Sequence, residues 1–119
     1  TISIQPWDKT AIGAIEKAII NSNLGFAPSN NGENIILNVP PLTEERRREL
    51  AKQAKVEAES TKITVRNARQ DGMKELRKLD GVSEDLIKDE EAKIQVLTDK
   101  YIKMCDDHLK VKEAEIMKI

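Results

Sequence analysis

Apolar and polar residues alternate at the beginning of the chain and again some thirty residues later. The alternation at Thr1–Gln5 predicts a short strand with one buried face, and Asn34–Val39 predicts a second strand. Between them, apolar residues recur every three or four positions, which predicts a helix from an N-cap at Asp8 to about Ile20. We expect Gly25 to take the left-handed position after this helix.

This strand–helix–strand order has a consequence for the direction of the strands. Two such strands are normally parallel and joined by a right-handed crossover, so we expect a parallel pair, with residues 26–33 as a loop. Two strands cannot form a stable sheet alone. Residues 1–39 are therefore interpreted as a partial small α/β domain.

Two consecutive prolines interrupt the pattern after the second strand. Pro40 and Pro41 break the backbone hydrogen-bonding pattern and stiffen the chain, so residues 40–42 are expected to be an inter-domain linker and hinge. Beyond it, residues 43–119 show helical periodicity with one break at Asp80–Val82. This predicts two long antiparallel helices, about 43–79 and 83–118, with Thr43 and Ser83 as their N-caps.

The two long helices differ in the width of their apolar stripes. On a helical wheel, the stripe of the first helix covers roughly 80° and is rich in small residues, whereas that of the last helix covers roughly 160°. One partner helix needs only a narrow stripe, so the last helix is expected to have two neighbours. The fold class is therefore mainly α: two long antiparallel helices of an incomplete three-helix bundle, whose third helix is missing or comes from another chain, preceded by a β-α-β remnant.

Charge is distributed unevenly, although the whole chain has a net charge of only −1. Residues 43–79 carry 11 Lys and Arg against 7 Asp and Glu, and residues 80–119 carry 7 against 11. On the wheel of the first long helix, a basic stripe lies within about 60° of Arg66. Its other members are Arg48, Lys52, Lys55, Lys62, Arg69 and Arg77.

One-sided rows of basic side chains are typical of surfaces that bind phosphate backbones. Arg66 and Arg69 have the fork-shaped donors that suit phosphate best. The alternative interpretation is a solvated helix face, softened by ion pairs between residues four apart. The pattern alone leaves the two interpretations equally open.

Little else in the sequence suggests chemistry. Cys105 and His108 are three residues apart, but a structural zinc site needs four ligands and no second Cys or His exists. Neither a glycine-rich phosphate loop nor a Ser-His-Asp arrangement is present. No run approaches the roughly 20 apolar residues of a membrane-spanning helix. We therefore expect no catalytic residues, no metal, no cofactor and no membrane partner, in a protein of the cytoplasm that is not an enzyme.

Four stretches, in order along almost the whole chain, resemble the ribosome-recycling factor family. They are Ala18–Gly25, Pro40–Arg47, Val65–Arg69 and Lys112–Met117. The family fold is a three-helix bundle joined by two linkers to a small α/β domain, and its first bundle helix precedes the small domain. The resemblance, and the absence of an initiator methionine before Thr1, imply a C-terminal fragment of such a protein.

The resemblance also implies a function. Family members bind rRNA of the large ribosomal subunit and act with elongation factor G to release post-termination ribosomes for reuse. The motif places family rRNA contacts at Arg66 and Arg69, with Arg47 near the start of the same helix, and domain pivoting at Pro40–Pro41. The helical wheel adds Lys55 and Lys62 to these candidates. The family often has two adjacent basic residues where this chain has Arg69-Gln70, so one contact is lost or supplied by a neighbour.

A second interpretation needs no family. Residues 43–119 alone read as a helical hairpin that dimerises as a structural or adaptor module without binding nucleic acid. Under either interpretation the uncovered half of the last helix exposes an apolar strip, so we expect the fragment to self-associate.

Overall fold

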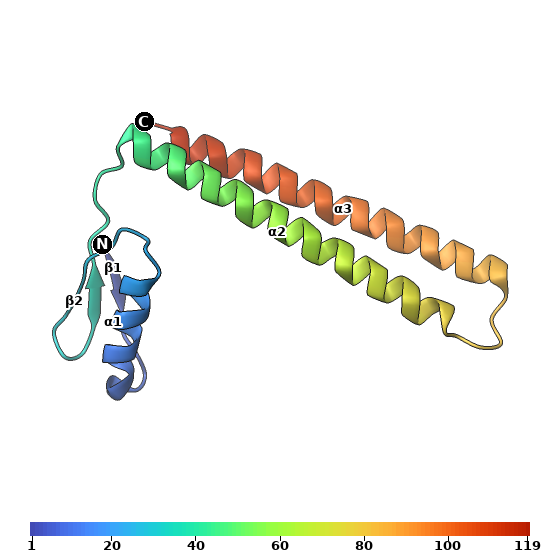
Figure 1. Cartoon of the computed structure of the whole chain (residues 1–119), viewed down its shortest axis with the longest axis horizontal. Coiled ribbons are helices and arrows are strands. Elements are labelled where there is room, and N and C mark those ends of the chain that lie inside the picture. The colour runs from blue at the N-terminus through green and yellow to red at the C-terminus, as the bar shows by residue number, and fades with distance from the viewer. The chain divides into compact units, whose positions relative to one another are not determined.

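The computed structural model describes all 119 residues and divides into two compact units, Thr1–Leu42 and Thr43–Ile119. Figure 1 shows that the first unit is a small sheet with one short helix and that the second is a hairpin of two long helices. Helical residues dominate, as the sequence predicts, and the two long antiparallel helices are confirmed.

The first unit contains three strands rather than two. Its elements are β1 (Ile2–Ile4), the 3₁₀ turn η1 (Lys9–Ala11), α1 (Ile12–Asn21), β2 (Pro28–Asn30) and β3 (Ile35–Leu37). Asp8 accepts a hydrogen bond from the backbone N–H of Thr10 at 2.9 Å, so it caps η1, and α1 follows without a break. Beyond the other end of α1, Gly25 is left-handed as predicted (φ 79°), but the position directly after the C-cap Ser22 is taken by Asn23, which is also left-handed (φ 55°).

The prediction of a parallel strand pair was wrong. The sheet has the order β1-β3-β2, and β3 is antiparallel to both neighbours, with Ile2 and Pro28 each opposite Leu37. The predicted loop at 26–33 contains β2, a polar edge strand in which Pro28 is tolerated. β1 and β2 therefore run in the same direction, as the crossover rule requires, and β3 is inserted between them in a split β-α-β arrangement.

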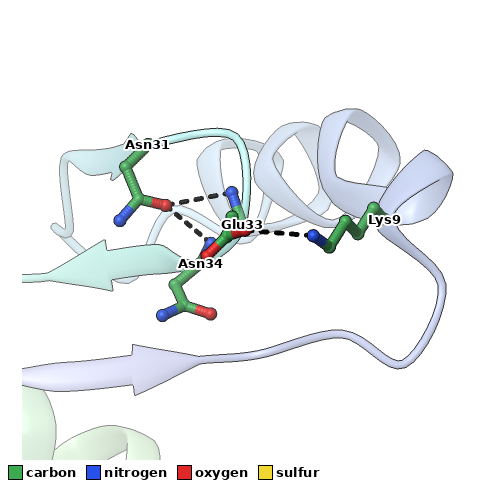
Figure 2. Close-up of polar contacts among 4 residues, drawn as sticks. All are labelled: Lys9, Asn31, Glu33 and Asn34. Carbon is green, nitrogen blue, oxygen red and sulfur yellow. Dashed lines mark hydrogen bonds and ion pairs between the residues drawn. The ribbon is translucent and has the colours of Figure 1, made fainter.

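A tight turn between β2 and β3 produces this reversal (Figure 2). The side-chain oxygen of Asn31 accepts hydrogen bonds from the backbone N–H groups of Glu33 and Asn34, at 3.0 and 2.8 Å. Gly32 supplies the positive φ of 84° that the turn requires. Lys9 forms a 3.1 Å ion pair with Glu33, which joins the turn to the segment before α1.

The core of the first unit is small. Ile12 from α1 packs with Ile35 and Leu37 from β3, and only these three apolar side chains are buried. Ile4, Ile15, Ile19 and Phe26 pack around them while remaining partly exposed. A core of this size contributes little stability on its own.

The second unit consists of α2 (Glu44–Arg77) and α3 (Glu84–Met117), each 34 residues long. The predicted caps are confirmed: Thr43 accepts from the backbone N–H of Arg46 at 3.1 Å, and Ser83 from that of Leu86 at 3.3 Å. The turn between the helices contains Gly81 with a φ of 74°. Local capping thus fixes where both long helices begin.

Helix α3 carries two apolar stripes side by side. One stripe faces α2: Thr98 is buried, and the Ile94 side chain lies close to Gly72. The other stripe is shifted by one residue and stays exposed, with Leu97 at 53%, Tyr101 at 47%, Met104 at 39% and Val111 at 59% exposure. The wide stripe of the last helix is therefore half covered by α2 and half uncovered.

Candidate nucleic-acid interface

The basic stripe of α2 separates into an inner row and an outer row. The inner row, Arg47, Lys62, Arg69 and Arg77, consists of side chains that contact α3. The outer row, Arg48, Lys52, Lys55 and Arg66, consists of exposed side chains that do not reach α3. The charges of the inner row are used in contacts within the protein, whereas those of the outer row are accessible to a ligand.

Lys62, in the inner row, is largely enclosed by its neighbours. Its side chain is 11% exposed, and its ammonium group lies 2.6 Å from a carboxylate oxygen of Asp106 on α3 and 3.0 Å from one of Glu59. Hydrogen bonds to Asp106 first, and then to Glu59, raise the pKa of Lys62 above its ordinary value. Its charge is thus largely neutralised within the protein.

Arg69 and Arg77 also span the two helices. The guanidinium of Arg69 donates to the side-chain oxygen of Gln95 at 3.0 Å, and that of Arg77 pairs with Glu91 at 2.8 Å. Arg69 is half-buried, while Arg77 remains exposed. Gln95 is neutral, so Arg69 keeps its full positive charge at the edge of the hairpin.

Arg47 closes the open end of the hairpin. Its guanidinium donates to the backbone carbonyl oxygens of Ile116 at 2.5 Å and Lys118 at 2.7 Å. These carbonyl groups lie at the C-terminal end of α3, where backbone acceptors lack partners within the helix. Arg47 therefore holds the end of α3 through one nitrogen of its guanidinium group.

The outer row is available to an external anion. Arg66, Lys55 and Lys52 are exposed, and none of them forms an ion pair within the chain. Arg48 forms a 2.5 Å ion pair with Glu44 that is exposed on both sides, and such pairs contribute little energy. From Arg48 to Arg66 the outer row extends over 18 residues, or about 27 Å of helix. A row of this length can follow several consecutive phosphate groups.

The sequence prediction therefore mixed two kinds of residue. Arg66 and Lys55 lie in the outer row, whereas Arg69, Lys62 and Arg47 lie in the inner row. Lys52 and Arg48 belong to the exposed stripe but were not among the candidates. The acidic residues of α3 at the same levels, such as Asp106, are the pattern that could have separated the rows.

Other features of the second unit give little indication of a metal site or a membrane-spanning segment. Cys105 and His108 both line a groove of about 340 Å³ between α2 and α3, beside Thr61 and Lys112. No group of three or more His, Cys, Asp or Glu side chains is arranged to hold a metal ion. The helices all fall short of the length and apolar character needed to cross a membrane.

Comparison with models of protein families shows which family this chain belongs to. The model of the ribosome recycling factor family matches residues 1–117. The chain belongs to the ribosome recycling factor family. This confirms the resemblance inferred from the four sequence stretches.

Named relatives agree with this family. Ribosome-recycling factors of Bacteroides thetaiotaomicron and Flavobacterium johnsoniae are each 56% identical to the chain over 121 aligned residues, and that of Flavobacterium psychrophilum is 57% identical. The alignments cover 100% of this chain but only 65% of each relative. The chain thus spans just under two thirds of the length of these recycling factors.

A solved structure shows the same fold. The solution structure of a ribosome recycling factor superposes with a TM-score of 0.60 at 42% sequence identity, covering 98% of this chain and 63% of that one. The two long helices and the small sheet therefore belong to the architecture of the family.

Proposed function

We propose that this chain acts in ribosome recycling, by docking the outer row of α2 on rRNA of the large ribosomal subunit. The observation that carries the proposal is the set of exposed, unpaired cations at Arg66, Lys55 and Lys52 on one side of a rigid helix. Family membership supplies the process, and the outer row supplies the surface that suits a phosphate backbone.

The proposed mechanism is non-covalent. Arg66 and Lys55 contact phosphates directly, and Arg69 joins them through the donors that its hydrogen bond to Gln95 leaves over. Lys62 and Arg47 act by holding α3 against α2, so that the cations of α2 are presented on a stiff support. No residue makes or breaks a bond, and no cofactor takes part.

The remaining parts of the proposal concern motion and partners. Pro40 and Pro41 lie in the segment without regular structure between β3 and α2, at the end of the first unit, and we assign the hinge to them. Elongation factor G would act on the first unit while the second stays on the rRNA, in the cytoplasm where ribosomes work. The family resemblance supports these assignments.

The test is co-sedimentation of the chain with purified large ribosomal subunits at moderate salt. Replacing both Arg66 and Lys55 by Ala removes two outer-row charges and should lower the bound fraction at least tenfold. The matched control replaces Lys74 and Lys78 by Ala, which removes two exposed charges at the C-terminal end and C-cap of α2. Equal loss in both double variants, or no loss in either, would contradict an rRNA-docking role for the outer row.

A further inference from the structure

Three of the five glycines in the chain directly follow an asparagine or an aspartate, at Asn31-Gly32, Asp71-Gly72 and Asp80-Gly81. In such a pair the backbone nitrogen of the glycine can attack the side-chain carbonyl carbon of the residue before it and close an imide ring. Glycine favours this reaction because it has no side chain to hinder ring closure. The structure places the three pairs in different backbone environments, and these environments decide which pair can react.

The two aspartyl pairs are poorly suited to ring closure. Asp71-Gly72 lies within α2, where the helical hydrogen-bond pattern holds the glycine N–H and the helical backbone keeps its nitrogen away from the carboxyl carbon. Ring closure there requires local unfolding of the helix. Asp80-Gly81 lies in the turn before α3, but a negatively charged carboxylate resists nucleophilic attack far more than a neutral amide does.

Asn31-Gly32 combines a neutral side-chain amide with an open turn. Both residues are exposed, and no atom beyond the chain neighbours lies within 4 Å of the position that a Cβ on Gly32 would take. Water therefore reaches the peptide bond between them. The Gly32 N–H donates to the side-chain oxygen of Asn30 at 3.3 Å, which is long for such a bond. The nitrogen that must attack is thus held only weakly.

The same turn stabilises the charge that develops during ring closure. Attack on Cγ of Asn31 moves an electron pair onto Oδ1, which becomes an oxyanion. This oxygen already accepts hydrogen bonds from the backbone N–H groups of Glu33 and Asn34, at 3.0 and 2.8 Å, while Nδ2 points away from these donors (Figure 2). Two backbone N–H groups directed at one oxygen stabilise oxyanions in acyl transfer. These contacts all lie within residues 30–34, so they do not depend on what covers the rest of the unit.

We propose that Asn31-Gly32 is a modification site at which the folded chain deamidates spontaneously in water. Hydroxide removes the Gly32 amide proton, and the nitrogen forms a bond to Cγ of Asn31. The bond from Cγ to Nδ2 then breaks, and Nδ2 takes a proton from water and leaves as ammonia. Water opens the imide ring at either carbonyl group. Breaking the new bond to Cγ gives an aspartyl residue at position 31, and breaking the original peptide bond gives an isoaspartyl residue.

The isoaspartyl product should open the turn between β2 and β3. It adds one carbon atom to the main chain, which displaces the hydrogen bond from the Asn31 N–H to the Asn34 carbonyl oxygen, 3.2 Å long in the unmodified chain. The new carboxylate also adds a negative charge two residues before Glu33. Since β2 pairs only with β3 and the core of this unit has three buried apolar side chains, little else holds the hairpin.

This modification is independent of rRNA docking. Asn31-Gly32 lies in the first unit, whereas the outer row lies on α2 in the second. Failure of deamidation therefore leaves the proposed function untouched, and failure of rRNA binding leaves the modification untouched.

Peptide mapping by mass spectrometry tests the site, after incubation of the folded chain at mildly alkaline pH. Asn31 should be converted before any other asparagine, at a rate proportional to hydroxide concentration, into two products that chromatography separates. Asp71-Gly72 is the control within the same molecule: its isoaspartyl form should appear in urea and not in the folded chain. An Asn31 that stays intact in the folded chain while it is converted in urea would overturn the proposal, as would equal isoaspartyl formation at Asp71.

Two glycine variants test the route through the imide. Gly32→Ala hinders ring closure and should slow conversion of Asn31 at least tenfold, both in the folded chain and in urea, where the strain of its φ of 84° plays no part. Gly13→Ala makes the same change at an open position of α1 that follows no asparagine, and it should leave the rate unchanged. Equal rates in the two variants would overturn attack by the Gly32 nitrogen.

Limited proteolysis tests the consequence of the modification. Asn31→Asp carries the charge of the product on an unaltered main chain, so it is the matched control for the isoaspartyl fraction. Cleavage between β2 and β3 should be at least several-fold faster in the isoaspartyl fraction than in this variant. Equal rates of cleavage would overturn the proposed opening of the turn.

Discussion

Arg47 and Ile116 are joined across the open end of the hairpin: the guanidinium of Arg47 donates to the Ile116 carbonyl oxygen at 2.5 Å. Helix α3 has no basic residue in its own last turn. A cation at a helix C-terminus is favourable because it meets the negative end of the helix dipole and satisfies free carbonyl groups. Arg47, in the first turn of α2, supplies this cation from the other helix.

Replacement of Arg47 by Ala should therefore destabilise the hairpin. Losing the part-buried hydrogen bond to Ile116 and the exposed one to Lys118, both from a charged donor, should lower the free energy of unfolding by about 1–3 kcal/mol. Urea denaturation followed by circular dichroism measures this. The neighbouring Arg48→Ala removes the same charge from an exposed position, so its effect should stay within about 0.5 kcal/mol. Equal losses of unfolding free energy in the two variants would contradict a stabilising role for the hydrogen bonds from Arg47 to the end of α3.

Lys62 should give the stability of the hairpin a dependence on alkaline pH. Its pKa is raised in the folded state by the hydrogen bonds to Asp106 and Glu59, above the ordinary value of 10.5. A lysine whose pKa is higher in the folded than in the unfolded state stabilises the fold. This contribution is complete at pH values below the pKa of the unfolded state, and it is lost as pH rises through the pKa of the folded state.

The measurement compares the chain with Lys62→Met in urea at several pH values. At pH 8 the wild-type chain should be more stable, and the difference should shrink once pH exceeds 10.5. A difference that stays constant from pH 8 to the alkaline limit would show that the ion pairs do not contribute in this way.

Two glycines should respond in opposite directions to the same substitution. Gly72 lies within α2, and a Cβ there would meet the Ile94 side chain at an ordinary contact distance of 3.8 Å. Gly72→Ala should therefore raise the free energy of unfolding by about 0.5–1 kcal/mol. Gly81 in the turn has a φ of 74°, so Gly81→Ala should lower it by about 1 kcal/mol. Thermal or urea unfolding of the two variants checks both signs, and a destabilising Gly72→Ala would mean that α2 and α3 approach more closely than described.

The parts of the fold that could be predicted are those set by local interactions. Thr43 and Ser83 determine the beginnings of α2 and α3 through hydrogen bonds to residues three positions later. The direction of β3 could not be predicted in this way. It depends on β2, whose residues Pro28–Asn30 have no apolar alternation and form a strand only by pairing with β3.

The candidate site shows a similar division. Helical periodicity places Lys62 and Arg66 on the same side of α2, about 40° apart. That small angle decides whether the side chain reaches Asp106 on α3, as Lys62 does, or remains free, as Arg66 does. The wheel of a single helix contains no information about the neighbouring helix, so the inner and outer rows could be separated only with the structure.

Replacing Arg66 should consequently affect only ribosome binding, whereas replacing Arg69 should affect both ribosome binding and stability. Arg66→Ala should reduce affinity for large ribosomal subunits and leave the unfolding free energy within about 0.5 kcal/mol of the wild-type value. Arg69→Ala should reduce affinity and also destabilise the hairpin, because it removes the hydrogen bond to Gln95. Parallel urea unfolding and co-sedimentation of the two variants separate these effects. A stability loss in Arg66→Ala equal to that in Arg69→Ala would contradict the division into rows.

The salt dependence of binding to large ribosomal subunits tests the central claim most directly. Each phosphate contact made by a basic side chain releases about one counterion, so the slope of log affinity against log salt counts such contacts. Arg66→Ala should reduce the magnitude of this slope by about one, whereas Lys78→Ala, at the C-cap of α2, should leave it unchanged. An unchanged slope for Arg66→Ala, or an equal reduction for Lys78→Ala, would contradict docking through the outer row.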